Sequence, residues 1–152
     1  MPSVLQFELY GRVRSMSSLR LYRVIMPVDD VESATQFYST LLEQPGMRVS
    51  PGRHYFRCGD VTLALYSPKA DGDPREPRPN FDHIYLAVED LEEVHRRAAR
   101  LGGLSTATGD GGLPMGEIAT RPWGERSFYM QDSFGNPLCF VDGRTLFTGR
   151  PA

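Results

Sequence analysis

The stretches LYRVIMPVDDVE (21–32) and FDHIYLAVEDLE (81–92) decide the fold, because they are two copies of one pattern. They align without gaps at an offset of 60 residues, which places Asp30 of the first copy on Asp90 of the second. Each copy is an apolar run rich in β-forming residues, followed by an acidic pair that can cap a helix. A repeat of this length predicts two modules of the same structure.

A helix is predicted after each acidic pair, because the apolar residues there recur with helical spacing. The recurring positions are Val31, Ala34, Phe37, Tyr38, Leu41 and Leu42 in the first copy and Leu91, Val94, Ala98 and Leu101 in the second. Short alternating runs typical of strands follow each helix. These runs are RHYFRC (53–58) and VTLALY (61–66) in the first half, and RSFYM (126–130) and PLCFVD (137–142) in the second.

These elements predict a β-α-β-β-β order in each half. Gly59 and Asp60 form a natural hairpin turn in the first half, and the DSFGN segment (132–136) takes the same place in the second. A four-stranded sheet with a single helix leaves one face bare. We therefore expect an α+β fold in which two mixed four-stranded sheets face each other around a cleft.

The repeat defines one domain with a flanking segment at each end. A stretch with four prolines and few apolar residues separates the halves, which is typical of a surface linker. The expected organisation is an N-terminal extension (1–18), a single domain (19–142) with modules at 19–67 and 81–142, a linker (68–80) and a C-terminal tail (143–152). The extension leaves three alternatives open: an extra edge strand, a mobile arm, or an upstream segment before a start at Met16.

The composition argues against several classes of partner. The 152 residues include 17 Lys and Arg against 19 Asp and Glu, a net charge of -2, so no electrostatic feature favours nucleic acid or an anionic membrane as a partner. No apolar run approaches the roughly 20 residues that cross a bilayer, and the N-terminus lacks the pattern of a secretory signal. Two cysteines, Cys58 and Cys139, are too few for a disulfide scaffold, so reduced thiols and a cytoplasmic location are expected.

The tandem β-α-β-β-β repeat resembles the vicinal oxygen chelate superfamily, which includes glyoxalase I, extradiol dioxygenases, fosfomycin-modifying enzymes and the bleomycin resistance protein. The resemblance covers about residues 19–142, and its most specific part is PMGEIATRPWGERSFYMQDSFGNPLCFVD (114–142). This segment is similar to the bleomycin-resistance pattern P-W-G-x-R-x-F-x-x-x-D-P-x-G-N. The matching residues are Pro122, Trp123, Gly124, Arg126, Phe128, Asp132, Gly135 and Asn136, with Ser133 where the pattern has proline.

In the metal-dependent members, the resemblance implies histidine or glutamine ligands on the first strand of each module and glutamate ligands on the last strand. The corresponding residues of this chain are Arg23, His83, Cys139 and, on VTLALY, Leu63 or Ala64. A guanidinium stays protonated and has no lone pair to donate, so Arg23 cannot be a ligand. His83 is then the one standard ligand, with Cys139 as a second candidate. We therefore expect no cofactor, and the alternative is a divalent Zn, Mn, Fe or Ni ion bound by His83.

Arg23 and His83 each have two interpretations. The positive charge of Arg23 could replace the metal and hold an anionic or carbonyl oxygen, or it could form an ordinary ion pair with Asp82 or Glu89. His83 could contact a ligand, or it could be a cleft or core histidine that is hydrogen-bonded to a neighbour. Cys139 could act as a nucleophile only if His83 lay beside it.

Aromatic side chains are the best candidates for the walls of a small-molecule cleft. Strand alternation suggests that Phe56, Tyr66, Tyr85 and Phe140 face it, and the resemblance places the loop residue Trp123 near the ligand groove. The alternative for Trp123 is a role as core filler. The complete set of expected ligand-binding residues is Arg23, Phe56, Tyr66, His83, Tyr85, Trp123, Cys139 and Phe140.

Two further expectations concern the second half. The segment 99–117 contains six glycines and is predicted to form a mobile loop over one mouth of the cleft. His95 lies among charged residues on the predicted helix and is expected to be solvated.

The resemblance implies two classes of function. The first is a homodimeric protein that binds and sequesters a small aromatic or antibiotic-like molecule in the cleft without a metal and without chemistry. The alternative is an enzyme of the same fold, a glyoxalase-like lyase or isomerase or a dioxygenase, that uses His83 with or without a divalent metal. A domain that acts mainly as a scaffold is a third possibility, which an aromatic cleft disfavours. No catalytic residue is assigned.

Overall fold

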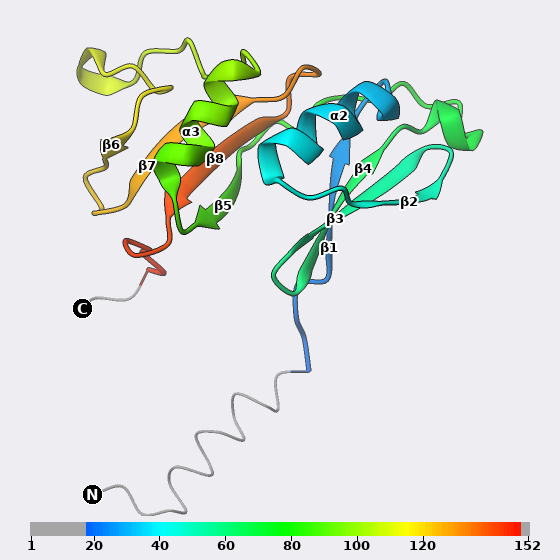
Figure 1. The fold of residues 1–152 in the computed structure, drawn as a ribbon, viewed down its shortest axis with the longest axis horizontal. Helices are drawn as coiled ribbons and strands as arrows, with labels where there is room; N and C mark the ends of the chain where they lie inside the picture. The colour runs from blue at the N-terminus through cyan, green and yellow to red at the C-terminus, as the bar shows by residue number, and fades with distance from the viewer. Residues whose placement is uncertain (1–17, 150–152) are drawn as a thin grey trace, which may run out of the picture.

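The computed structural model describes residues 18–149, which fold into two modules side by side (Figure 1). Most of the N-terminal extension, residues 1–17, lies outside the described residues. The first module comprises β1 (Arg23–Pro27), α2 (Val31–Leu42), β2 (Met47–Ser50), β3 (Arg53–Cys58) and β4 (Val61–Tyr66). The second comprises β5 (Ile84–Val88), α3 (Leu91–Arg100), β6 (Ala119–Thr120), β7 (Arg126–Gln131) and β8 (Pro137–Asp142). Two short 3-10 turns, η1 (Lys69–Asp71) and η2 (Asp110–Gly112), lie in the connecting segments.

Each module contains one mixed four-stranded sheet, in the order β1-β4-β3-β2 and β5-β8-β7-β6. The first and last strands of each module pair in parallel, and the other neighbours are antiparallel. The parallel pairing requires a crossover, which the helix and the two middle strands provide. The prediction of an α+β fold with two such sheets is confirmed.

The acidic pair of each repeat starts a helix as predicted. The Asp30 side chain accepts a hydrogen bond from the backbone N–H of Glu32, at 3.0 Å. The Asp90 side chain accepts one from the N–H of Glu93, at 3.1 Å. These bonds satisfy donors that the first turn of a helix leaves without a backbone partner. None of the helices within residues 18–149 has the length and apolar character needed to cross a membrane.

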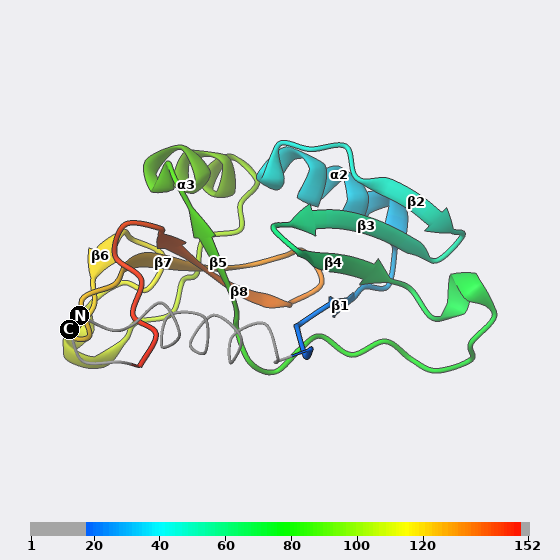
Figure 2. The ribbon, with the colours of Figure 1, turned by 90° about the horizontal axis from the view of Figure 1, so that it is seen from below.

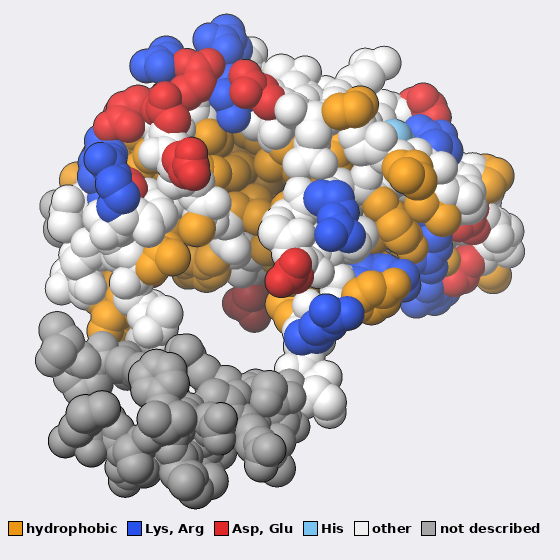
Figure 3. Space-filling view, turned by 60° about the horizontal axis from the view of Figure 1, so that its bottom comes forward, with side chains coloured by type: hydrophobic (Ala, Val, Ile, Leu, Met, Phe, Trp, Pro, Cys, Tyr) orange, Lys and Arg blue, Asp and Glu red, His pale blue; other side chains and the backbone are white. Residues whose placement is uncertain are grey.

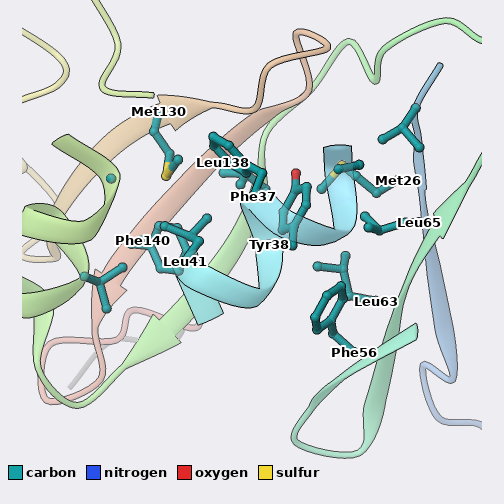
Figure 4. Close-up of a cluster of buried hydrophobic side chains, with 14 of the residues drawn as sticks. Met26, Phe37, Tyr38, Leu41, Phe56, Leu63, Leu65, Met130, Leu138 and Phe140 are labelled. Carbon is teal, nitrogen blue, oxygen red and sulfur yellow. The ribbon is translucent and has the colours of Figure 1, made fainter. Parts of the chain in front are cut away.

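Both helices lie on the same side of the two sheets (Figure 2). Apolar residues of the helices and of the helix-facing strand positions form one continuous core that extends through both modules (Figure 4). Its largest fully buried members are Tyr38, Phe56, Phe128, Phe140, Met26, Leu41, Leu63, Leu65, Leu91, Met130 and Leu138. Within residues 18–149 no helix covers the opposite face of either sheet, so that face of the strands is open to a ligand.

The DSFGN segment ties the second module to the first. The buried Asp132 carboxylate accepts hydrogen bonds from the Tyr38 hydroxyl at 2.7 Å and from the Asn136 amide at 2.8 Å. The Asn136 side-chain amide also donates to the backbone carbonyl oxygen of Pro27, and its side-chain oxygen Oδ1 accepts from the backbone N–H of Asn80 at 2.8 Å. Burial, and then the Asp132 carboxylate, raise the pKa of Tyr38 well above its usual value, so its hydroxyl remains a donor. The motif therefore has a structural role at the junction of the modules.

Candidate functional site

Three side chains form a row across the helix-free face of the second sheet. Strand register places Tyr85 beside Cys139 and Cys139 beside Tyr129. The imidazole of His83 packs edge-on against the Tyr129 ring, with 5.0 Å between the ring centroids. The sheet thus brings together His83, Tyr85 and Cys139, three of the residues predicted from the sequence, around a fourth that was not predicted.

Three groups at this face, on Cys139, Tyr129 and His83, have pKa values that favour their uncharged forms at pH 7. Burial raises the pKa of the Cys139 thiol to about 11 and the pKa of the Tyr129 hydroxyl to about 12. Partial desolvation lowers the pKa of His83 below its usual value, against an opposing effect of Asp82. Because the thiolate is the nucleophilic form of cysteine, this environment disfavours covalent chemistry at Cys139. The row can offer neutral hydrogen-bonding groups and aromatic surface to a ligand.

The RPWGE segment (121–125) is a tight turn that displays Trp123. The backbone N–H of Gly124 donates to the carbonyl of Arg121 at 2.9 Å, which puts Pro122 at the turn position where its fixed φ is favoured. Gly124 has a φ of 95°, which disfavours a side chain there. Trp123 is 46% exposed, and its indole N–H donates to Glu125 at 2.7 Å, which fixes the orientation of the ring.

Trp123 and Tyr129 line the same pocket, with a volume of about 580 Å³. The remaining lining residues come from the turn, from β6 and from the glycine-rich segment, and they are Gly109, Leu113, Met115, Thr120, Arg121 and Pro122. Most of these side chains are apolar or aromatic. The pocket is therefore suited to a flat, mainly apolar molecule that is held by a few polar groups.

The glycine-rich segment packs against the sheet beside this pocket. Met115 packs on the buried side chains of Tyr129, Cys139 and Val141. The half-buried His95 bonds through Nε2 to the carbonyl of Gly116 at 2.9 Å and packs edge-on against Phe128. The expectation that His95 is solvated is therefore wrong, because this loop contact was not visible in the helix pattern. His95 holds the loop to α3.

The first sheet also has a pocket on its helix-free face, with a volume of about 700 Å³. Tyr66 lines it, as expected for a ligand-facing residue, and the Arg53 guanidinium lies 4.1 Å from the centre of the Tyr66 ring. Its other lining residues come from β1 and from the linker, and they are Ile25, Pro27, Pro68, Arg75, Glu76, Pro77 and Arg78. Three of the nine lining residues are thus arginines.

Arg23 lies at the start of β1 and stacks on aromatic rings. Its guanidinium lies 4.9 Å from the centre of the Tyr22 ring and 5.1 Å from that of the Tyr55 ring. No ion pair involves Arg23 within residues 18–149, so the pairing with Asp82 or Glu89 is not formed. The charge of Arg23 remains exposed to solvent on this face.

Phe56 and Phe140 are core residues, which corrects the prediction that they face the cleft. Each is 1% exposed and belongs to the cluster on the helix side of its sheet. Phe140 stacks on Phe128, with 5.5 Å between the ring centroids, and lies at the base of a crevice of about 420 Å³ between the modules. Figure 3 shows hydrophobic side chains in a hollow between the two halves of the molecule, with charged side chains around it.

Of the eight residues that line the pocket of about 580 Å³, only Trp123 was in the predicted ligand-binding set, and the most important omissions are Tyr129 and Arg121. Tyr129 follows Phe128 in an apolar run, so either residue could have faced the core. Arg121 had one available signal, a cation directly before the Pro-Trp-Gly turn. Its partners are Glu117, four residues earlier, and Ser127 and Tyr129 on β7, and the sequence pattern did not show that they enclose its side chain.

The side chains that could coordinate a metal ion are not grouped in a way that favours metal binding. Within the described part of the chain, no group of three or more His, Cys, Asp or Glu side chains is arranged to hold a metal ion. His83 and Cys139 share one region of the second sheet, but the partners found around them are aromatic rings and hydroxyl groups. A catalytic metal usually requires three protein ligands.

The family model of the Glyoxalase/Bleomycin resistance protein/Dioxygenase superfamily matches residues 20–140 of the chain. No curated protein matches the chain. Among solved structures, a glyoxalase/bleomycin resistance protein from Albidiferax ferrireducens T118 is 20% identical, with 86% of this chain and 98% of that chain covered and a TM-score of 0.62.

Two further solved structures bear on the two classes of function. A lactoylglutathione lyase from Agrobacterium tumefaciens is 20% identical, with 84% of this chain and 96% of that chain covered and a TM-score of 0.61. A bleomycin-binding protein complexed with bleomycin is 18% identical, with 82% and 98% covered and a TM-score of 0.55. At these identities the similarity to the solved structures shows the fold alone.

Proposed function

The chain belongs to the Glyoxalase/Bleomycin resistance protein/Dioxygenase superfamily, and from this premise we propose that it binds a small aromatic or antibiotic-like molecule without a metal and without chemical conversion. The observation that carries the proposal is the pocket between the Pro-Trp-Gly turn and the second sheet. It presents the half-exposed Trp123 and the Tyr129 ring on walls that are mostly apolar. Aromatic surfaces of this kind favour stacking with a flat ligand.

The chemistry of the site supports binding over catalysis. Cys139 and Tyr129 both have pKa values far above 7, and no three-donor metal group occurs within residues 18–149. The enzyme alternative would have to rely on His83, whose ring packs against Tyr129. The bleomycin-binding relative of the same fold illustrates that this architecture can hold a drug.

Ligand binding should change the fluorescence of Trp123, the one tryptophan of the chain. We expect saturable quenching by planar aromatic compounds, with bleomycin and naphthalene derivatives as first probes, and the same titration curve in the presence of EDTA. Trp123→Phe replaces the indole by a smaller ring that cannot bond to Glu125, and it should weaken binding, measured by calorimetry, by about 10-fold. The matched control is Tyr22→Phe, an aromatic change outside this pocket.

Two outcomes would argue against the proposal. If no compound perturbs Trp123 while the protein is folded, the pocket is not a ligand site. If binding requires a metal that is present at one ion per chain and is lost in His83→Ala, the enzyme alternative is favoured.

The proposal includes a homodimer in the cytoplasm. A row of residues, Ile25, Ala64, Tyr55 and Met47, crosses the helix-free face of the first sheet. Met47 is 69% exposed, and Tyr85 on the second sheet is 58% exposed. Exposed apolar surface on a bare sheet face supports contact with a partner, and the second sheet of another copy, also four-stranded, would cover it. The two free thiols agree with a reducing compartment.

Sedimentation analysis should give twice the 17.1 kDa mass of the chain. A carboxylate in the sheet face, introduced as Ile25→Glu, should shift the protein toward the single-chain mass because a charge buried at an interface is costly. The control Thr40→Glu places the same charge on the exposed side of α2 and should leave the dimer intact. A single-chain mass for the unsubstituted protein would contradict the dimer.

A further inference from the structure

Arg121 is a buried cation that has no carboxylate partner within the described residues. Only 5% of the residue is exposed. Its Nε donates to the Ser127 hydroxyl at 2.9 Å, and its Nη2 donates to the Ser127 carbonyl at 2.9 Å and more weakly to the Glu117 carbonyl at 3.5 Å. Its guanidinium also lies 4.9 Å from the centre of the Tyr129 ring. All these partners are neutral, and a buried charge without a counter-charge is energetically costly.

The nearest acidic residue on the same turn is already occupied. Of the Glu125 carboxylate oxygens, one accepts from the Trp123 indole at 2.7 Å and the other from the backbone N–H of Phe147 at 3.0 Å. The Arg121 atom Nη1 has no hydrogen-bond partner among residues 18–149, and it is not among the fully buried polar atoms that lack one. Since Arg121 lines the pocket of about 580 Å³, Nη1 is the guanidinium nitrogen available to a ligand there.

Building on the proposed function, we propose that this pocket is specific for aromatic molecules that carry one anionic group, a carboxylate or its equivalent. The anion pairs with Arg121 at Nη1, and the ring of the ligand stacks on Trp123. The apolar surfaces of Leu113 and Met115 cover the rest of the ring. A charge-assisted hydrogen bond to a guanidinium is among the strongest polar contacts in a protein.

The pocket therefore presents a positive charge to its ligand, whereas a site for a cationic drug would present a negative one. A positively charged ring bound at Trp123 would bring its charge close to Arg121, and the described lining of the pocket contains no carboxylate to offset the repulsion. The Glu125 carboxylate lies beside Trp123, but both of its oxygens already accept hydrogen bonds. The helix-free face of the first sheet has the same sign, because Arg23, Arg57 and Arg78 have no ion pair within the described residues. Figure 3 shows basic side chains between hydrophobic ones over the first module.

Three probes of nearly the same shape test which ligand charge the pocket of the unsubstituted protein prefers. They are 2-naphthoate, its neutral amide 2-naphthamide, and the cation 2-naphthylmethylammonium, each titrated by calorimetry and by Trp123 fluorescence. We expect 2-naphthoate to bind at least about 10-fold more tightly than the amide, with the cation weakest. Equal binding of 2-naphthoate and the amide overturns the charge proposal and leaves the proposed function standing. Binding of none of the three overturns both.

Substitutions then test whether the preference for the anionic probe depends on Arg121. Arg121→Gln should bring the affinities of 2-naphthoate and 2-naphthamide within about 2-fold of each other, whereas Arg121→Lys keeps a cation and should retain part of the preference. The control Arg100→Gln removes an arginine from the exposed end of α3 and should change neither affinity. A preference that persists in folded Arg121→Gln overturns the assignment to Arg121. If that variant does not fold, Arg121→Lys decides: a reduced but remaining preference for 2-naphthoate supports the assignment to Arg121, and an unchanged preference overturns it.

Discussion

Asp132→Ala should lower the free energy of unfolding by about 3–5 kcal/mol, one of the two largest losses we expect from a single substitution in this chain. The Asp132 carboxylate accepts from the Tyr38 hydroxyl, the Asn136 amide and the backbone N–H groups of Phe134 and Asn136, at 2.7–2.9 Å. Alanine would leave these donors buried without an acceptor, which costs more than the hydrogen bonds themselves contribute. Urea unfolding followed by circular dichroism measures the loss.

The control for this prediction is Asp60→Ala, in the exposed turn between β3 and β4, which should cost less than about 0.5 kcal/mol. Asp132→Asn should fall between the two, because an amide keeps one acceptor but directs its own donors at the others. A loss below about 1 kcal/mol for Asp132→Ala would mean that water replaces the carboxylate, and the junction would then not depend on this residue.

Phe140→Ala should cost a similar amount, about 3–5 kcal/mol, because it opens a cavity in the core that both modules share. The Phe140 ring is 1% exposed and stacks on Phe128 at 5.5 Å. Tyr85→Ala removes an aromatic residue from the same sheet, but its side chain is 58% exposed on the opposite face. It should cost less than about 1 kcal/mol in the single chain. Denaturant midpoints at equal slope compare the two variants, and similar losses would refute the assignment of the two faces.

The repeat determined how much of the fold could be predicted. Helical spacing and acidic caps are local properties, so both helices and the longer strands were located from residues 21–32, 81–92 and the alternating runs. The strands β2 and β6 were counted but not located, because MRVS (47–50) has only four residues with an irregular register between Arg48 and Ser50, and β6 has only two residues.

The candidate site was predicted less completely, because the sequence pattern of a strand does not show which of its two faces packs against the helix and which is open to a ligand. RHYFRC and PLCFVD have apolar residues on both faces, so alternation could not distinguish Phe56 from Tyr55 or Phe140 from Cys139. Tyr85 and Tyr66 do lie at the helix-free faces, since their strand neighbours pack in the core. Trp123 lies on the Pro-Trp-Gly turn and lines the pocket there. Arg121 and the contact between His95 and Gly116 depend on the path of a loop, which no local pattern specifies.

The junction made by the DSFGN segment has a consequence for protein synthesis. The carbonyl oxygens of Ile25 and Pro27 in the first strand receive their hydrogen bonds from Asn80 and Asn136, and the Tyr38 hydroxyl receives its acceptor from Asp132. In a nascent chain these groups of the first module therefore remain exposed to water, without their protein partners, until residues 132–136 of the second module have left the exit tunnel. Truncated chains that end within the second module would thus expose an incomplete core and become substrates for chaperones and proteases.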